Sequence, residues 1–184
     1  MSAQEFVDYM LKEHKKDLKK YLTEFNKTNS SEIIIYTDGS MPNNKLAKKM
    51  DLTGGLGVYI IMPDKTVVSI SEKVLNSTNN IAELKAIEKA LDFLSELTFT
   101  PTSVTIFSDS MYCINSVTKW YKTWIVNGWK TSKGTSVENK ELINNIISKI
   151  GNFSYFINFK HVKAHSGIYG NEMADVLAVA GSKK

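Results

Sequence analysis

The amino-acid sequence predicts an α/β fold in which a five-stranded mixed sheet is flanked by helices. Short β-branched runs bounded by turn residues alternate with longer segments of helical periodicity, and their order along the chain is βββαβααβα. The first three strands follow one another closely, which favours antiparallel pairing. The later strands are separated by helices, and such crossover connections allow parallel pairing.

The length of 184 residues and the hydrophobic content of 42% are sufficient for one ordinary core. We therefore predict two parts: residues 1–29 as a helical extension with its linker, and residues 30–184 as a single folded domain. No internal repeat or low-complexity tract divides the domain further.

Residues 4–25 are predicted to form an amphipathic helix whose apolar side chains share one stripe, while lysines and acids occupy the other face. The apolar stripe consists of Val7, Met10, Leu11, Leu18, Tyr21, Leu22 and Phe25. His14 falls on this stripe, where a packing role is expected. The helix could serve core packing, duplex binding or partner docking, and the sequence leaves these three roles open.

The first predicted strand is buried and ends at an acid. Its β-branched run, Ile33–Tyr36, is followed by the turn-like residues Thr37, Asp38, Gly39 and Ser40. The remaining elements are predicted as strands at 57–62, 66–74, 104–108 and 155–159 and helices at 80–97, 111–119, 139–150 and 170–180.

Glu83 lies on the apolar face of its predicted helix, together with Ile87 and Leu91. An uncompensated carboxylate facing a core would cost several kcal/mol or hold a proton, whereas a bound cation would keep the group ionised. The alternative is a first-turn glutamate that the helix dipole stabilises.

Three aspartates have weaker signals. Asp38 and Asp109 follow predicted strands, where an aspartate can simply form a turn or an N-cap. The carboxyl ends of strands are also where open α/β sheets bind ligands. Asp175 lies opposite the apolar stripe of its helix, so periodicity predicts an exposed surface residue.

Converging acids suit phosphodiester hydrolysis by two hard cations about 4 Å apart, which prefer carboxylate oxygens and water. The sequence contains no cysteine cluster for zinc, no GKS or GKT phosphate loop and no GxSxG nucleophile elbow.

The formal charge of +4 and the pI near 9.0 are compatible with a polyanionic partner. Every basic residue apart from the histidines is a lysine, which favours contacts with the backbone over reading of base edges. Cys113 stands alone and cannot form an internal disulfide, and no apolar run is typical of a signal peptide or a membrane span. An intracellular protein, in the cytoplasm or nucleus, is expected.

Five strings stand in order on the expected elements: YTDGS at 36–40, TNNIAEL at 78–84, FSDSMY at 107–112, GWKTSKG at 128–134 and HVKAHSGIYGNEMAD at 161–175. Together they resemble type 1 ribonuclease H, the cellular rather than the retroviral form. The likeness covers Ile33 to Gly181 and implies an RNase H-like fold, with residues 30–184 as the catalytic domain. Nothing in residues 1–31 resembles the hybrid-binding domain that some family members carry.

The resemblance implies an endonuclease that cuts the RNA strand of RNA–DNA hybrids without sequence specificity and leaves 5′-phosphate and 3′-hydroxyl ends. It makes Asp38, Glu83, Asp109 and Asp175 the catalytic ligands of two Mg²⁺ ions, for which Mn²⁺ can substitute. His165, in the loop before the last helix, is implied to assist proton transfer or product release.

The resemblance also implies a set of substrate-binding residues: Asn44 or its neighbour Asn43, Thr78, Asn79, Asn80, Met111, Trp120, Trp124, Thr131 and Asn139. Thr78 and Asn139 match a pocket for a DNA-strand phosphate, but Asn76 stands where relatives often carry an arginine. Asn79 and Asn80 match residues that meet the 2′-hydroxyls of RNA.

Residues 120–133 interleave tryptophans with lysines and resemble the substrate-handling protrusion of the family. The alternative is that one or more of these tryptophans pack on the core. Asn171 is expected to open the last helix as its N-cap and, in this family, lies near the site.

Two other hypotheses stay open. The same fold could serve as a non-catalytic module that binds nucleic acid or protein, although the presence of all four acids and the histidine argues against it. It could also be a nuclease for another duplex, although GWKTSKG and TNNIAEL resemble hybrid-reading elements. The expected partner is an RNA–DNA hybrid; no obligate protein partner is evident, and a monomer is expected.

Overall fold

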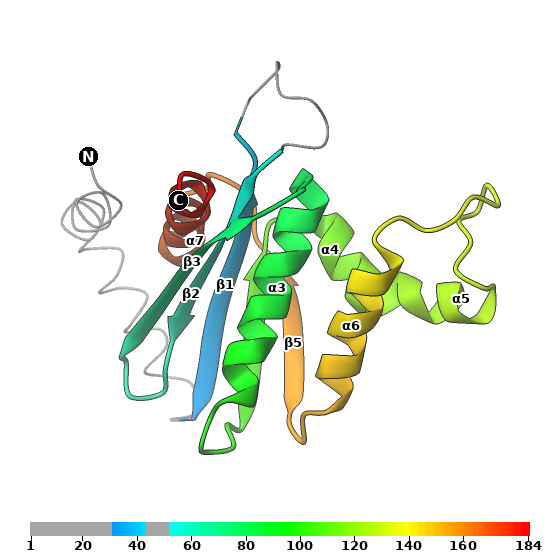
Figure 1. The fold of residues 1–184 in the computed structure, drawn as a ribbon. Helices are drawn as coiled ribbons and strands as arrows, with labels where there is room; N and C mark the ends of the chain where they lie inside the picture. The colour runs from blue at the N-terminus through cyan, green and yellow to red at the C-terminus, as the bar shows by residue number, and fades with distance from the viewer. Residues whose placement is uncertain (1–30, 43–51) are drawn as a thin grey trace.

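The computed structural model describes residues 31–42 and 52–184 of the chain (Figure 1). The predicted N-terminal helix and Asn44 in the first loop lie outside these residues. No helix in the described part of the chain is both long and apolar enough to cross a membrane.

The five strands form one mixed sheet, as predicted, and their order in it is β3-β2-β1-β4-β5. The strands are β1 (Glu32–Ser40), β2 (Gly54–Ile61), β3 (Val67–Val74), β4 (Ser103–Ser108) and β5 (Phe156–His161). The first three are antiparallel neighbours, while β1, β4 and β5 run parallel. The carboxyl ends of the three parallel strands therefore share one edge of the sheet.

The first strand does not end at its acid, which corrects the prediction. Parallel pairing with β4 stops at Thr37 opposite Ser108, but antiparallel pairing with β2 continues to Ser40 opposite Gly55. Asp38 is therefore held within a strand, paired with Gly57, just past the last pair with β4. An acid held by pairing with a neighbouring strand is placed more rigidly than one in a turn.

Helices cover both faces of the sheet (Figure 1). They are α3 (Asn79–Ser95), α4 (Met111–Asn115), η1 (Ser116–Trp120), α5 (Tyr121–Val126), α6 (Lys140–Gly151) and α7 (Tyr169–Ser182). The main core lies between the sheet and the helices α3 and α6, and includes Ile33 and Ile35 of β1. A smaller core under α7 includes Ile34 and Tyr36, because successive side chains of a strand point to opposite faces.

The helix predicted at residues 111–119 is longer than expected. It continues through the π-helical segment η1 into α5 and ends at Val126. The sequence pattern was misleading here because Trp120, Tyr121 and Trp124 read as an irregular aromatic stretch, whereas ring contacts along the helix support its extension.

Candidate active site

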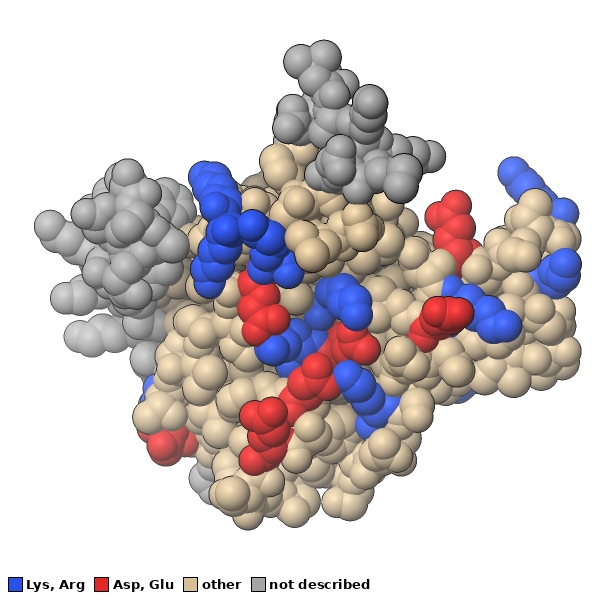
Figure 2. Space-filling view, viewed as in Figure 1, with Lys and Arg blue, Asp and Glu red and all other residues tan. Residues whose placement is uncertain are grey.

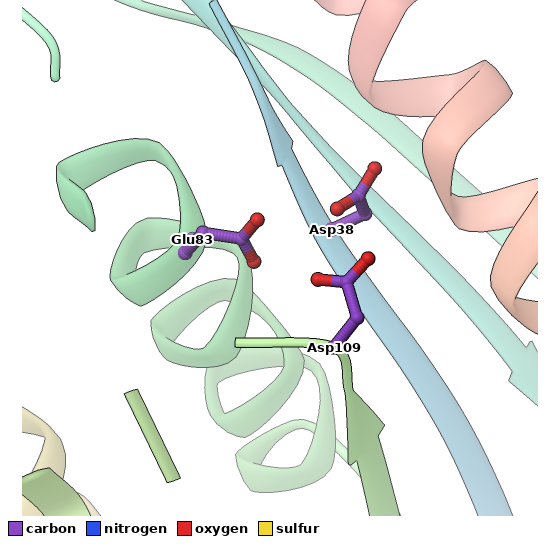
Figure 3. A group of neighbouring side chains, drawn as sticks. All are labelled: Asp38, Glu83 and Asp109. Atoms are coloured by element: carbon purple, nitrogen blue, oxygen red, sulfur yellow. The ribbon is translucent and has the colours of Figure 1, made fainter. Parts of the chain in front are cut away.

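Three carboxylates from separate parts of the chain meet at the carboxyl edge of the parallel strands (Figure 3). Asp38 comes from β1, Glu83 from the second turn of α3, and Asp109 directly follows β4. One carboxylate oxygen of each lies within 4.8 Å of the others. Three of the four acids singled out in the sequence are thus brought into one group.

Glu83 reaches this edge because α3 packs directly on β1. Gly39 lies against the helix, and a side chain there would overlap the main-chain nitrogen of Glu83 and the backbone of Ala82. The main-chain N–H of Gly39 also donates a hydrogen bond to the Glu83 carboxylate. The helix begins just before, where the Thr78 hydroxyl accepts a hydrogen bond from the Ile81 N–H at 3.3 Å.

The group is electrostatically strained. Burial raises the pKa of Asp38, and the charges of Glu83, Asp109 and Asp175 raise it further. Burial, followed by the Asp109 charge, also raises the pKa of Glu83, and a hydrogen bond joins the Asp38 and Glu83 carboxyls. Without a cation, these groups therefore retain protons that ordinary carboxyls have lost at neutral pH.

The donor set fits a hard divalent cation. Its atoms are carboxylate oxygens, which Mg²⁺, Ca²⁺ and Mn²⁺ prefer. Oε2 of Glu83 is buried and has no hydrogen-bond partner in the described part of the chain. A buried carboxylate oxygen without a partner is costly, and a bound cation would remove that cost.

Asp175 lies beside this group, on α7. It is half-buried, although periodicity predicted an exposed residue. Its charge raises the pKa of Asp38, Glu83 and Asp109. The helix comes close because Gly57, the partner of Asp38, has no side chain: a methyl group there would overlap the Ala174 carbonyl oxygen of α7.

Asn171 does not cap α7, and the prediction of an N-cap is wrong. The helix begins at Tyr169, after Ile168, so that Asn171 falls in its first turn and is 3% exposed. Its side chain hydrogen-bonds the Asp109 carboxylate and opposes the rise in the pKa of Asp109 that burial causes. The buried Asn171 Oδ1 atom has no hydrogen-bond partner among residues 31–42 and 52–184. Asn171 thus orients an acid of the site.

Two histidines lie close to Asp109. His165, predicted from the sequence, is exposed in the loop between β5 and α7 and has a positive φ of 50°. His161, which sequence reasoning missed, ends β5 and places Nε2 3.2 Å from the Asp109 carbonyl oxygen. Burial raises the pKa of Asp109, and the charges of both histidines oppose that rise. The sequence signal that could have indicated His161 is its place just after the predicted strand at 155–159, since the ends of parallel strands lie near one another.

A row of aromatic rings leads from α4 into the protrusion, residues 120–133. Ring centroids are 6.2 Å apart for Tyr112 and Trp120, 5.8 Å for Trp120 and Trp124, and 6.0 Å for Trp124 and Trp129. Trp124 and Trp129 pack against the main core, whereas Trp120 is 41% exposed. Figure 2 shows lysine side chains at the tip of the protrusion.

The other described residues expected to bind substrate lie at the starts of α3 and α4, in the protrusion and just before α6. Thr78 and Asn79 are exposed and Asn80 is half-buried, all at the start of α3. Met111, at the start of α4, is 44% exposed. The Asn139 Nδ2 group donates a hydrogen bond to the Tyr112 hydroxyl at 3.2 Å.

Thr131 lies in the turn of the protrusion, where its hydroxyl is 2.8 Å from that of Thr135. This contact holds the turn together.

Comparison with known proteins gives a consistent result. The family model described as RNase H matches residues 30–183. A ribonuclease HI of Pasteurella multocida is 39% identical over 152 residues, which are 83% of this chain and 90% of that protein. A ribonuclease HI of Haemophilus ducreyi is 37% identical over 148 residues, which are 80% of this chain and 88% of that protein.

Solved structures agree in fold. The RNase H domain of PFV aligns with a TM-score of 0.69 at 26% identity and covers 82% of this chain and 94% of that domain. LC9-RNase H1, a type 1 RNase H with the type 2 active-site motif, aligns with a TM-score of 0.70 at 23% identity and covers 85% of this chain and 74% of that one.

Proposed function

This chain belongs to the ribonuclease H family as a type 1 member, and we propose that it is an endonuclease that hydrolyses the RNA strand of RNA–DNA hybrids. Cleavage is independent of sequence and leaves 5′-phosphate and 3′-hydroxyl ends. The observation that carries the proposal is the convergence of the Asp38, Glu83 and Asp109 carboxylates within 4.8 Å of one another.

The proposed ligands of two Mg²⁺ ions, for which Mn²⁺ can substitute, are Asp38, Glu83, Asp109 and Asp175. When bound, the ions supply activation of water and stabilisation of the charge that develops at the scissile phosphate. Gly39 and Asn171 orient the Glu83 and Asp109 carboxylates through the contacts described above.

His165 is proposed to move the proton. Hydrolysis breaks the bond between phosphorus and the 3′-oxygen, and the departing oxygen needs a proton to leave as a hydroxyl. An exposed imidazole beside Asp109 suits this task, because histidine exchanges protons near neutral pH. The same position favours a part in product release.

The substrate-binding surface is proposed to run from the start of α3 to the protrusion. Asn79 and Asn80 contact the 2′-hydroxyls of the RNA strand, which distinguish RNA from DNA. Thr78 and Asn139 hold a DNA-strand phosphate, with Asn76 in place of a charged partner. Trp120 offers an exposed ring to the sugar-phosphate backbone.

The proposed domain boundary follows the family match. Residues 30–184 form the catalytic domain, because the match begins at residue 30 and the first strand at Glu32. Residues 1–29 form an extension. We expect a monomer located in the cytoplasm or nucleus.

The proposal is tested with one end-labelled RNA–DNA hybrid, the matching double-stranded RNA and the matching double-stranded DNA, each with Mg²⁺ and with EDTA. We expect cleavage of the RNA strand of the hybrid, dependent on Mg²⁺, with fragments that carry 5′-phosphates. Cleavage confined to duplex DNA would show a same-fold nuclease of another specificity. Binding of the hybrid without cleavage would indicate a non-catalytic module.

A further inference from the structure

His161 is the last residue of β5 and belongs to the final pair of the parallel register with β4. The register of the two last parallel strands pairs Ser108 with His161, and the Val162 N–H donates to the Ser108 carbonyl at 3.0 Å. Past that point the main chains no longer pair. The His161 side chain continues the connection, with Nε2 3.2 Å from the carbonyl oxygen of Asp109.

The direction of this contact is fixed by its acceptor. A carbonyl oxygen can only accept a hydrogen bond, so Nε2 of His161 donates. Both the neutral Nε2–H tautomer and the doubly protonated ring offer that donor. The contact therefore holds whether or not the ring carries a charge.

Asp109 needs such support because it belongs to no regular element. β4 ends at Ser108 and α4 begins at Met111, after its N-cap Ser110. The connection is tightened locally by the Ser110 N–H, which donates to the Ser108 hydroxyl at 3.1 Å. From the neighbouring strand β5, His161 donates a further hydrogen bond to the main chain of Asp109. The carboxylate of the same Asp109 lies beside those of Asp38 and Glu83 (Figure 3).

We propose that His161 is a positioning residue for the metal site: its imidazole fixes the peptide after β4, and so aims the Asp109 carboxylate at the other two acids. Its role differs from that of His165, because it acts through the main chain of an acid and touches no reacting atom. Groups that orient metal ligands typically contribute about 10- to 100-fold in metal affinity or activity.

The inference rests on the proposed metal site, and the test separates the two. Mn²⁺ binding to the full chain is measured without substrate, by calorimetry, for the wild-type protein and for His161→Ala, His161→Gln and Lys160→Ala. Glutamine retains an amide donor near the place of Nε2. Lys160 is an exposed neighbour on the same strand and serves as the control.

We expect His161→Ala to raise the Mn²⁺ dissociation constant about tenfold. His161→Gln and Lys160→Ala should stay within about threefold of wild type, and all melting temperatures should be similar because His161 is exposed. Wild-type Mn²⁺ binding by His161→Ala, or an equal loss in His161→Gln, would overturn the inference alone. Absence of Mn²⁺ binding by the wild-type protein would overturn the metal site and the inference together.

Discussion

Gly39 and Glu83 are in backbone contact, and the N–H of the first donates to the carboxylate of the second. This contact sets the distance between β1 and the helix that carries the second acid. Since Asp38 is the residue before Gly39, one dipeptide of β1 both supplies an acid and places another.

Substitution of Gly39 by alanine should therefore damage both fold and site. The added methyl group overlaps the backbone of α3, and overpacking of this kind costs about 1–3 kcal/mol of unfolding free energy. Chemical denaturation and Mn²⁺ titration measure the two effects. Gly151→Ala is the control, because nothing lies within 4 Å of the added atom. Equal stability of the two variants would contradict the contact.

Asp109→Asn should bind the hybrid but lose cleavage by more than about a hundredfold, since groups that merely orient metal ligands are already worth about 10- to 100-fold. The substitution does not alter the surface proposed to bind the hybrid, so hybrid affinity measured by fluorescence anisotropy should stay near wild type. Glu96→Gln, an exposed acid at the end of α3, should cut normally. Undiminished cleavage by Asp109→Asn would remove it from the metal site.

The metal-free protein should become less stable as pH rises. Burial and like charge raise the pKa of Glu83 to about 8 and that of Asp38 to about 10, above their values in the unfolded chain. The folded state then binds more protons than the unfolded state above about pH 4, and stability falls by up to about 1.4 kcal/mol per pH unit for each proton.

Thermal unfolding in EDTA between pH 5 and pH 9 measures this loss. Mg²⁺ should raise the melting temperature more at pH 9 than at pH 5, because protons compete with the ion. Asp38→Asn should be more stable than wild type in EDTA at pH 8. A melting temperature that is independent of pH in EDTA would refute the electrostatic description of the site.

Two tryptophans of the aromatic row should have different roles, Trp120 in hybrid binding and Trp124 in stability. Trp120→Ala removes an exposed ring and should weaken hybrid binding by about 1–3 kcal/mol with little change in melting temperature. Trp124→Ala removes a ring packed against the core and should cost about 3 kcal/mol of stability. KM values and denaturation midpoints distinguish the two. Equal destabilisation by both changes would place Trp120 in the core instead.

Removal of residues 1–28 should leave a domain that folds and cuts hybrids. Ser31 is retained, and its carbonyl oxygen accepts a hydrogen bond from the Thr102 N–H just before β1 and β4 begin. A lower melting temperature would assign the extension to packing, and weaker hybrid binding would assign it to the duplex. If neither changes, docking to a partner remains. A truncated domain that fails to fold would contradict the boundary.

The sequence predicted the sheet and three acids for identifiable reasons. A buried strand shows in the sequence as a β-branched run, and Glu83 shows as an acid on an apolar helical face. Both are patterns within a single element, so the sequence alone reveals them. Helical periodicity gave the wrong burial for Asp175, which it predicted to be exposed and which is half-buried. Periodicity compares a residue only with its own helix and does not register that α7 meets the end of β1, where Gly57 lets it approach.

The sequence did not indicate His161, and it predicted the wrong local role, an N-cap, for Asn171; the two errors have a related cause. Each acts on Asp109 from an element distant in the chain, His161 through a parallel register and Asn171 through the position of the first turn of α7. Neither register nor helix start can be fixed to one residue by local pattern. The residues that orient the acids were therefore harder to predict than the acids themselves.

The site draws on β1 and on α7, which follows all the other described elements along the chain. A nascent chain that has released everything except α7 would contain Asp38, Glu83 and Asp109, but would lack both Asn171 and Asp175 and the cover over Tyr36 and Tyr59. The three-acid group alone is therefore an incomplete site, and nuclease activity should arise only after α7 has been synthesised and has packed on the sheet.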